Sequence, residues 1–480
     1  MAFFHGVKAS QVPTSIIPPR QISASIPVFV GCAPIHRLPD SSHAAKNGEV
    51  VLCYSNAEAV RSLGYTASDN FEKWGLSEAA YTMFVMYACA PAIFINIFDP
   101  TVHKKAVTNE SVTLTSSGGQ LAHDDIIEFI LTTSEGVECQ DGIDYALNNI
   151  TGQISVAKTG ILNGATSVNV TYTYAAPELV TTNECIGGVD LNNNKTTGLQ
   201  LIDRVFTQYR VLPGVIVAPG FSDDPSVAAI MATKAGAING IFRAIAVADL
   251  PKSLINYIHV PEYKIKKNLV QEDLIVCWPR AIFNNQVMRL STLTAGVIAK
   301  TDANNDDVPY VSPSNELLNM QSATADGINE LWLSLDNANS LNANGIVTAL
   351  NFNGGWRLWG NRTACFPDVT DIKDTFISNR RMFGWYSNQL ILTWWQKVDD
   401  PIGHRLIQTI MNSEQITLNS YTAKGYILGG RIEFLESENS TLDLMDGIIQ
   451  FHINLGTQSP AEHINFRLEY DPDYLSTLFG

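Results

Sequence analysis

The sequence has little charge and none of the short motifs that mark common active sites. Charged residues make up 16% of the 480-residue chain, and the formal net charge is −16 at pH 7. Nucleic-acid phosphates and anionic lipids repel a chain of this sign, so direct nucleic-acid binding is not expected. The patterns GxGxxG, GxxxxGK[ST], GxSxG and HExxH are all missing. We therefore predict no catalytic residue and no cofactor.

Cysteine pairs and membrane-spanning runs are also lacking. The seven cysteines are scattered, odd in number and contain no CxxC, which is typical of reduced thiols in a protein folded in the cytosol. The longest apolar stretch, residues 81 to 98, contains Pro91, which ends a helix there. We expect a buried helix before Pro91 and a buried strand after it, without membrane insertion.

Two acidic loops begin like calcium-binding loops but do not continue like them. In the loop that starts at Asp302, Asp307 stands where the turn needs glycine, and Pro313 stands where a bidentate glutamate is needed. In the loop that starts at Asp190, Lys195 takes the glycine position. Both are interpreted as solvated loops, and no metal site is predicted.

The first 350 residues alternate between two patterns. Apolar runs alternate with helical segments over residues 21–99 and 178–351, which predicts an α/β domain whose parallel strands are covered on both faces. Between them, residues 100–177 show short β-branched runs separated by glycine-containing turns. We predict an inserted, peripheral β-rich domain there, in an α/β (α+β) multidomain protein.

The C-terminal part predicts a second α/β domain over residues 352–460, flanked by an arm. Helices are expected over residues 376–397 and 401–418, and strands over 426–435, 448–455 and 463–470. In the last strand Ile464, Phe466, Leu468 and Tyr470 alternate with polar residues, as in a half-buried strand that needs a partner. We name residues 461–480 the C-terminal arm and residues 1–20 the N-terminal arm.

Residues 354 to 363, GGWRLWGNRT, admit two interpretations. A loop so rich in aromatic and polar groups suits a ligand, but no set of acids, bases or metal ligands accompanies it. The alternative is a structural turn in which glycines permit positive φ, tryptophans anchor the loop, and polar side chains bond the backbone. We predict the structural turn, formed by Trp356, Trp359, Gly360, Asn361 and Arg362.

Several segments occur in the order found in one known family. They include FHGVKASQVPTSIIPP followed by SIPVFVGCAP, then AIFINIFDP, LPGVIVAPGF, and WGNRT followed by a helix with paired arginines. In this series the chain resembles the sheath proteins of contractile phage tails and related injection particles. The resemblance leaves open which of these two kinds of particle carries the chain.

The resemblance implies a structural role without catalysis. Such subunits form six-membered rings stacked helically around a tail tube, and contraction drives the tube through the target envelope. The implied partners are other sheath copies, the tail tube protein, and baseplate and tail terminator proteins. The implied location is a virion tail assembled in the host bacterial cytoplasm. An α/β hydrolase-like enzyme with a β insertion, or another virion structural protein, remains the alternative.

Both arms are predicted to exchange strands between subunits, because an extended segment can add to a neighbour's sheet edge. At about 3.3 Å per residue, the N-terminal stretch spans about 45 Å. The exchanging residues are Phe4, Val7, Val12, Ile16, Ile464, Phe466, Leu468 and Tyr470, and the acceptor sheet holds Ile432, Phe434, Ile449, Phe451 and Ile453. Alternatively, residues 463–470 fold back on their own chain.

The charge pattern suggests how the subunit meets the tube. By family resemblance, the C-terminal domain lies innermost. Its candidate tube-facing charges are Arg380, Arg381 and Lys397, or the acidic stretch of residues 433–446. Exposed ion pairs contribute about 0–1 kcal/mol each, which suits a contact that must later release.

Overall fold

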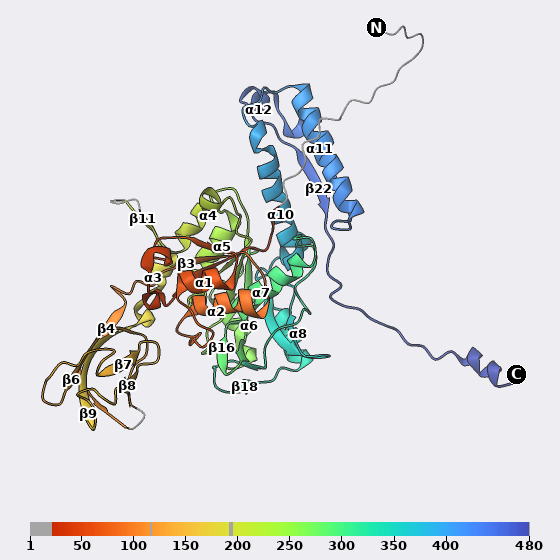
Figure 1. The fold of residues 1–480 in the computed structure, drawn as a ribbon. Coiled ribbons are helices and arrows are strands. Elements are labelled where there is room, and N and C mark those ends of the chain that lie inside the picture. The colour runs from red at the N-terminus through yellow and green to blue at the C-terminus, as the bar shows by residue number, and fades with distance from the viewer. Residues whose placement is uncertain (1–21, 116–117, 192–194, 480) are drawn as a thin grey trace, which may run out of the picture.

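The computed structural model describes residues 22–115, 118–191 and 195–479 (Figure 1). Its centre is an eight-stranded sheet. The strand order is β2 (Val51–Cys53), β3 (Ala92–Asn96), β1 (Pro27–Gly31), β12 (Val215–Val217), β13 (Ile245–Asp249), β14 (Leu274–Cys277), β19 (Ile346–Asn351) and β20 (Trp356–Trp359). Strands β3 to β19 run parallel, whereas the two edge strands pair antiparallel.

Helices cover both faces of this sheet, because successive strand residues are apolar and point to opposite sides. Val28 and Val30 join one buried cluster, whereas Phe29 joins the other. One face is covered by α1 (Asn56–Leu63), α2 (Gly75–Tyr81) and α7 (Leu290–Ala303), and the other by α4 (Ile202–Tyr209), α5 (Pro225–Gly236), α6 (Val260–Lys266) and α8 (Leu335–Asn342). The predicted α/β fold class is confirmed.

The apolar stretch of residues 81 to 98 crosses the core of this domain. Helix α2 continues as a π-helical turn, η3 (Thr82–Met86), and the chain then enters β3 after Pro91. In the described part of the chain, no helix is both long and apolar enough to cross a membrane.

A smaller four-stranded sheet has the order β16 (Gln286–Met288), β15 (Arg280–Phe283), β17 (Ser322–Thr324) and β18 (Glu330–Leu331).

A separate β lobe projects from one side of the α/β domain (Figure 1). Its two three-stranded sheets are β4 (Lys104–Thr113), β9 (Ser167–Ala175) and β6 (Ile126–Thr133), and β5 (Gly119–Gln120), β8 (Gln153–Val156) and β7 (Tyr145–Asn148). Leu131, Ile154 and Val170 belong to a buried cluster of its own. Its ends meet, because Ala176 N donates to His103 O at 3.0 Å.

A buried ionic network fastens the β lobe to the α/β domain. Asp125, which precedes β6, accepts hydrogen bonds from Arg37 Nε at 2.7 Å, Lys73 Nζ at 2.6 Å and Trp74 Nε1 at 3.0 Å. Burial alone raises the pKa of Asp125, but the His36 ring and the charges of Arg37 and Lys73 outweigh burial and hold this pKa well below its usual range.

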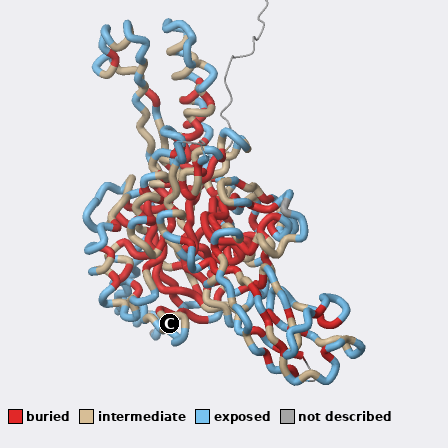
Figure 2. Tube along the Cα trace, turned by 90° about the vertical axis from the view of Figure 1, so that its left-hand side faces the viewer, coloured by how far each residue is buried: buried red, intermediate tan, exposed pale blue. Residues whose placement is uncertain are grey.

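A C-terminal lobe extends from the opposite end of the domain (Figure 1). It comprises α10 (Ile377–Trp394), α11 (His404–Ala423), β21 (Gly429–Glu433), α12 (Thr441–Met445) and β22 (His452–Gly456). Met382, Trp385, Leu418 and Tyr421 belong to its small core. Figure 2 shows buried residues concentrated in the α/β domain, whereas the outer end of this lobe is mostly exposed or half-buried.

The predicted domain boundary at residues 351 and 352 needs correction. It separates β19 from β20, yet these strands pair from Thr348 with Trp359 to Asn351 with Trp356. Residues 352 to 376 therefore belong with the α/β domain, and the C-terminal lobe begins at α10.

The fold also contains two short helices, α3 (Thr182–Ile186) and α9 (Ile372–Thr375), and a two-stranded pair, β10 (Val189–Asp190) with β11 (Lys195–Thr196).

We expect Asp125→Asn to lower the free energy of unfolding at the β-lobe junction by about 3 kcal/mol, because the buried Arg37 and the half-buried Lys73 lose their shared partner, although Arg37 keeps Asp69 and Lys73 keeps Asp124. Hydrogen exchange of peptides around residues 120–130 measures this. Because the native pKa of Asp125 lies below its ordinary value of 3.8, the stabilisation is present above pH 3.8 and is lost as the pH falls below it.

The matched control is Asp124→Asn. The Asp124 side chain is 55% exposed and also contacts Lys73. We expect Asp124→Asn to change the same hydrogen-exchange rates little, because an exposed ion pair contributes about 0–1 kcal/mol. Equal protection of the two variants at neutral pH would contradict the role given to Asp125.

Candidate assembly interfaces

The GGWRLWGNRT segment forms more than a turn. Residues Trp356–Trp359 make strand β20 at the sheet edge, which corrects the prediction of a turn throughout. The turn itself lies just before this strand, where Gly354 and Gly355 have φ of 95° and 119°. Trp356 is buried, and its Nε1 donates to Gln321 O at 2.9 Å. The correction arises because a WRLW run alternates buried and half-buried residues, as an edge strand does.

After β20 the chain turns towards α10. Gly360 has φ of 133°, a conformation that favours glycine, and its N donates to Ser314 Oγ at 3.0 Å. Asn361 is buried, and its backbone O accepts from Ile377 N, the first residue of α10, at 2.9 Å. These bonds hold the loop against the start of α10.

Arg362 lies between two aromatic rings. Its guanidinium carbon is 4.5 Å from the ring centroid of Phe366 and 3.7 Å from that of Phe376. The same guanidinium donates to Thr375 Oγ1 at 3.2 Å and to the Glu462 carboxylate, with Nε to Oε1 at 3.0 Å. The predicted turn residue therefore contacts the C-terminal arm, 100 residues further along the chain.

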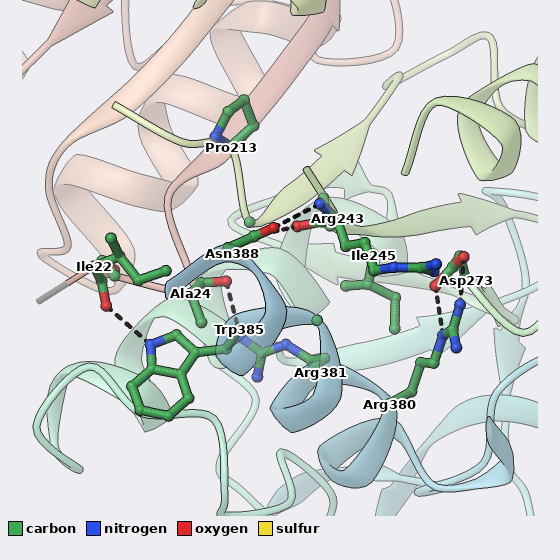
Figure 3. A pocket seen from close by; sticks show the side chains of 14 residues that line it. Ile22, Ala24, Pro213, Arg243, Ile245, Asp273, Arg380, Arg381, Trp385 and Asn388 are labelled. Carbon is green, nitrogen blue, oxygen red and sulfur yellow. Dashed lines mark hydrogen bonds and ion pairs between the residues drawn. The ribbon is translucent and has the colours of Figure 1, made fainter. Parts of the chain in front are cut away.

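The junction of α10 with the α/β domain is held by polar contacts around a small pocket (Figure 3). The guanidinium of Arg381 pairs with the buried Asp302 carboxylate and donates to Ala24 O at 3.2 Å. Trp385 Nε1 donates to Ile22 O at 3.1 Å. These contacts fix the first described residues of the chain against α10.

Arg380 pairs in the same region but with other acids. Its Nε donates to Asp273 Oδ1 at 2.6 Å and its Nη1 to Asp374 Oδ1 at 2.9 Å. The side chains of Arg380 and Arg381 are only 11% and 3% exposed. Both arginines therefore form ion pairs within the subunit. This corrects the prediction that they face a tube. Lys397, with its side chain 34% exposed, pairs with Asp400 at 2.8 Å.

The predicted acceptor sheet is present as a hairpin shorter than expected. β21 pairs antiparallel with β22, and Ile432 lies opposite Ile453. Phe434, Ile449 and Phe451 fall outside these strands, although the rings of Phe434 and Phe451 lie 5.5 Å apart. The reason is Asn439, whose amide donates to both Leu435 O and Gln450 O at 2.9 Å and so replaces the strand ladder.

The apolar residues of the C-terminal arm are exposed. Ile464, Phe466, Leu468 and Tyr470 are 69%, 84%, 97% and 73% exposed. Within the residues that the structure describes, residues 463 to 470 form no strand and no hydrogen bond, so the fold-back on β22 does not occur here. The segment runs away from the lobe (Figure 1). Phe4, Val7, Val12 and Ile16 lie outside the described residues.

Comparisons with known proteins point to one family. No protein-family model matches the chain. The tail sheath protein of Burkholderia phage BcepMu is 28% identical over 498 aligned residues, which cover 100% of this chain and 99% of that protein. Over its whole length, the chain is similar to this tail sheath protein.

Two solved structures share the fold of this chain. The sheath complex of the extracellular contractile injection system PVC, in its contracted state, matches with a TM-score of 0.59 and 12% identity over 99% of both chains. A chain of the six-fold symmetrised baseplate of the anti-feeding prophage (AFP) matches with a TM-score of 0.58 and 13% identity over 98% of this chain and 100% of that one. The resemblance found in the sequence is therefore confirmed.

Three residues at these junctions were not predicted from the sequence as contact residues. Glu462 contacts Arg362, Asp302 contacts Arg381, and Asn439 ends the hairpin. The first two partners are separated by 100 and 79 residues, and no local pattern links them. For Asp302, the failed calcium loop was the only local signal, and it indicated solvent exposure.

We expect Arg381→Ala to lower the free energy of unfolding by about 3–5 kcal/mol, because it leaves a buried carboxylate without its cation. Burial raises the pKa of Asp302, and Arg381 opposes that rise. Guanidinium denaturation followed by tryptophan fluorescence measures the loss. Lys397→Ala is the control and should change the unfolding free energy by at most about 1 kcal/mol. Equal midpoints for the two variants would exclude a structural role for the Arg381 pair.

Proposed function

We propose that this chain is the sheath subunit of a contractile tail or injection particle. Copies polymerise as six-membered rings stacked around a tail tube, and the assembly contracts to drive the tube through the target envelope. Its partners are further copies, the tube protein, and baseplate and tail terminator proteins. The particle assembles in the host bacterial cytoplasm, without membrane insertion or nucleic-acid contact.

The observation that supports this function most directly is the exposed arm. Its apolar residues alternate with polar ones and are mostly exposed within the described residues, so a subunit on its own leaves large side chains in water. A neighbouring sheet edge buries one face of such a segment and pairs its backbone. The hairpin of β21 and β22 has only two strands and offers such an edge. The full-length homology and the fold of contracted sheaths support the same conclusion.

The placement of the lobes follows from the same proposal. The C-terminal lobe lies towards the tube, and the β lobe lies on the outside. With Arg380 and Arg381 engaged internally, the charges left for the tube are those of Lys397 and of the acidic segment around α12. Trp395 and Val398, next to Lys397, are 63% and 62% exposed and suit a further contact in the assembly.

We expect the variant Ile464→Asp, Phe466→Asp, Leu468→Asp to fold as a monomer but form no tubes, because it charges the face that a neighbour must bury. Removing residues 463–480 or 1–18 should have the same effect. Negative-stain electron microscopy and pelleting measure assembly, and circular dichroism checks the fold. The matched control, Asn465→Ser, Arg467→Ser, Glu469→Ser, changes the opposite face and should assemble. Tubes from the apolar-face variant would disprove strand exchange.

We expect Ser134→Cys, in the exposed turn after β6, to react with a maleimide equally fast in monomers and in tubes, because the β lobe faces outwards. All seven native cysteines are buried, so the introduced thiol is labelled selectively. Leu468→Cys provides the comparison and should become protected on assembly. Protection of Cys at position 134 in tubes would show that the β lobe is an inner or inter-subunit element.

A further inference from the structure

The chain after β22 is attached to the subunit at two points, one just before the C-terminal arm and one at its start. Gln458 Nε2 donates to Gly425 O at 2.7 Å, at the end of α11. Glu462 then accepts from Arg362 through both carboxylate oxygens, with Nε to Oε1 at 3.0 Å and Nη2 to Oε2 at 2.5 Å. The next residue, His463, begins the stretch to Tyr470, which forms no strand and no hydrogen bond within the described residues. The boundary between attached and unattached chain therefore falls at Glu462.

The group that holds Glu462 is oriented in advance. The rings of Phe366 and Phe376 pack against the guanidinium of Arg362. Thr375 Oγ1 accepts a hydrogen bond from a third side of the same group, through Arg362 Nη1. A guanidinium fixed in this way presents a planar fork that matches a carboxylate, which a lysine cannot reproduce. The Arg362 side chain is 16% exposed and that of Glu462 is 44% exposed, so the pair is formed at the surface and can open.

The loop that carries Arg362 is itself rigid. Arg362 forms a β-bridge with Phe376, and Thr363 Oγ1 donates to Asp374 O at 2.7 Å. The guanidinium is therefore fixed relative to both the α/β domain and the start of α10. We call Arg362, Phe366, Phe376 and Glu462 the arm clamp.

We propose that Arg362 is a positioning residue that sets the point and direction at which the C-terminal arm leaves the subunit for a second copy of this chain. This inference rests on the proposed function. Gln458 stays attached when the clamp opens, so the free chain up to Leu468 then begins at residue 459 instead of residue 463 and is about 1.7 times as long. The effective concentration of the arm at a neighbour's sheet edge falls with about the −3/2 power of this length, so opening the clamp lowers it about twofold.

The test variant is Glu462→Lys, which places a cation against Arg362 without altering any core residue. In the unassembled protein, nitroxides on His463→Cys and Ser340→Cys report the position of the arm relative to α8, and the buried native cysteines stay unlabelled. We expect a narrow distance distribution in the otherwise wild-type chain and a broad one in Glu462→Lys. Raising the salt concentration should broaden the first and leave the second unchanged, because salt screens a surface ion pair.

Assembly provides the second measurement. We expect the critical concentration for tube formation to rise at least about twofold in Glu462→Lys. Glu135→Lys, in the exposed turn of the β lobe, makes the same change in charge and should assemble like the wild-type chain. A narrow distance distribution in Glu462→Lys, or a broad one with an unchanged critical concentration, would overturn the inference. A wild-type chain that forms no tubes would instead refute the proposed function, while the distance measurement still decides whether Arg362 holds the arm.

Discussion

The buried ion pair between Arg381 and Asp302 is the contact on which the arrangement of the C-terminal lobe depends. Taking two charges out of water is unfavourable, and only a forked, hydrogen-bonded geometry offsets that cost. The pair joins the second turn of α10 to the end of α7, within the main body of the protein. Any other position of α10 leaves at least one charge buried without a partner, so one orientation is strongly preferred.

Helix α10 consequently organises both ends of the chain. Its Arg381 and Trp385 hold the backbone at Ala24 and Ile22, where the described chain begins. Its start, next to Phe376, carries the surface on which Arg362 meets Glu462. The first described residues and the base of the C-terminal arm are therefore both held beside α10. A rotation of this helix would move both of these points together.

The sequence predicted those parts of the fold whose pattern is local. The strands near residues 26 and 215, helix α5 and the β lobe follow from apolar runs, helix caps and glycine turns. Strand β20 was missed because two glycines and two tryptophans resemble a loop, and only its pairing with β19 makes it a strand. Strand β22 is shorter than predicted because Asn439, which lies outside the strand, donates to Gln450 O and so ends the pairing with β21.

Charges were the least predictable part of the candidate interfaces. Paired arginines in an apolar helix look like a surface patch, but each has an acid more than 75 residues away in sequence. Such pairs depend on the three-dimensional fold, and a single sequence carries no signal for them. For the exposed arm, the alternation of Ile464 to Tyr470 predicted a strand, but these residues form none within the described chain, so the strand stays a prediction that requires a partner.

The meeting of His103 and Ala176 at the base of the β lobe has an evolutionary consequence. A domain that has its own core, and whose two ends touch, can be exchanged for another without moving the strands on either side. The β lobe can then diversify, or carry a fused cargo, while the central sheet evolves independently of it. A replacement domain would need its own partner for Arg37 and Lys73, because these two residues belong to the α/β domain and Asp125 belongs to the β lobe.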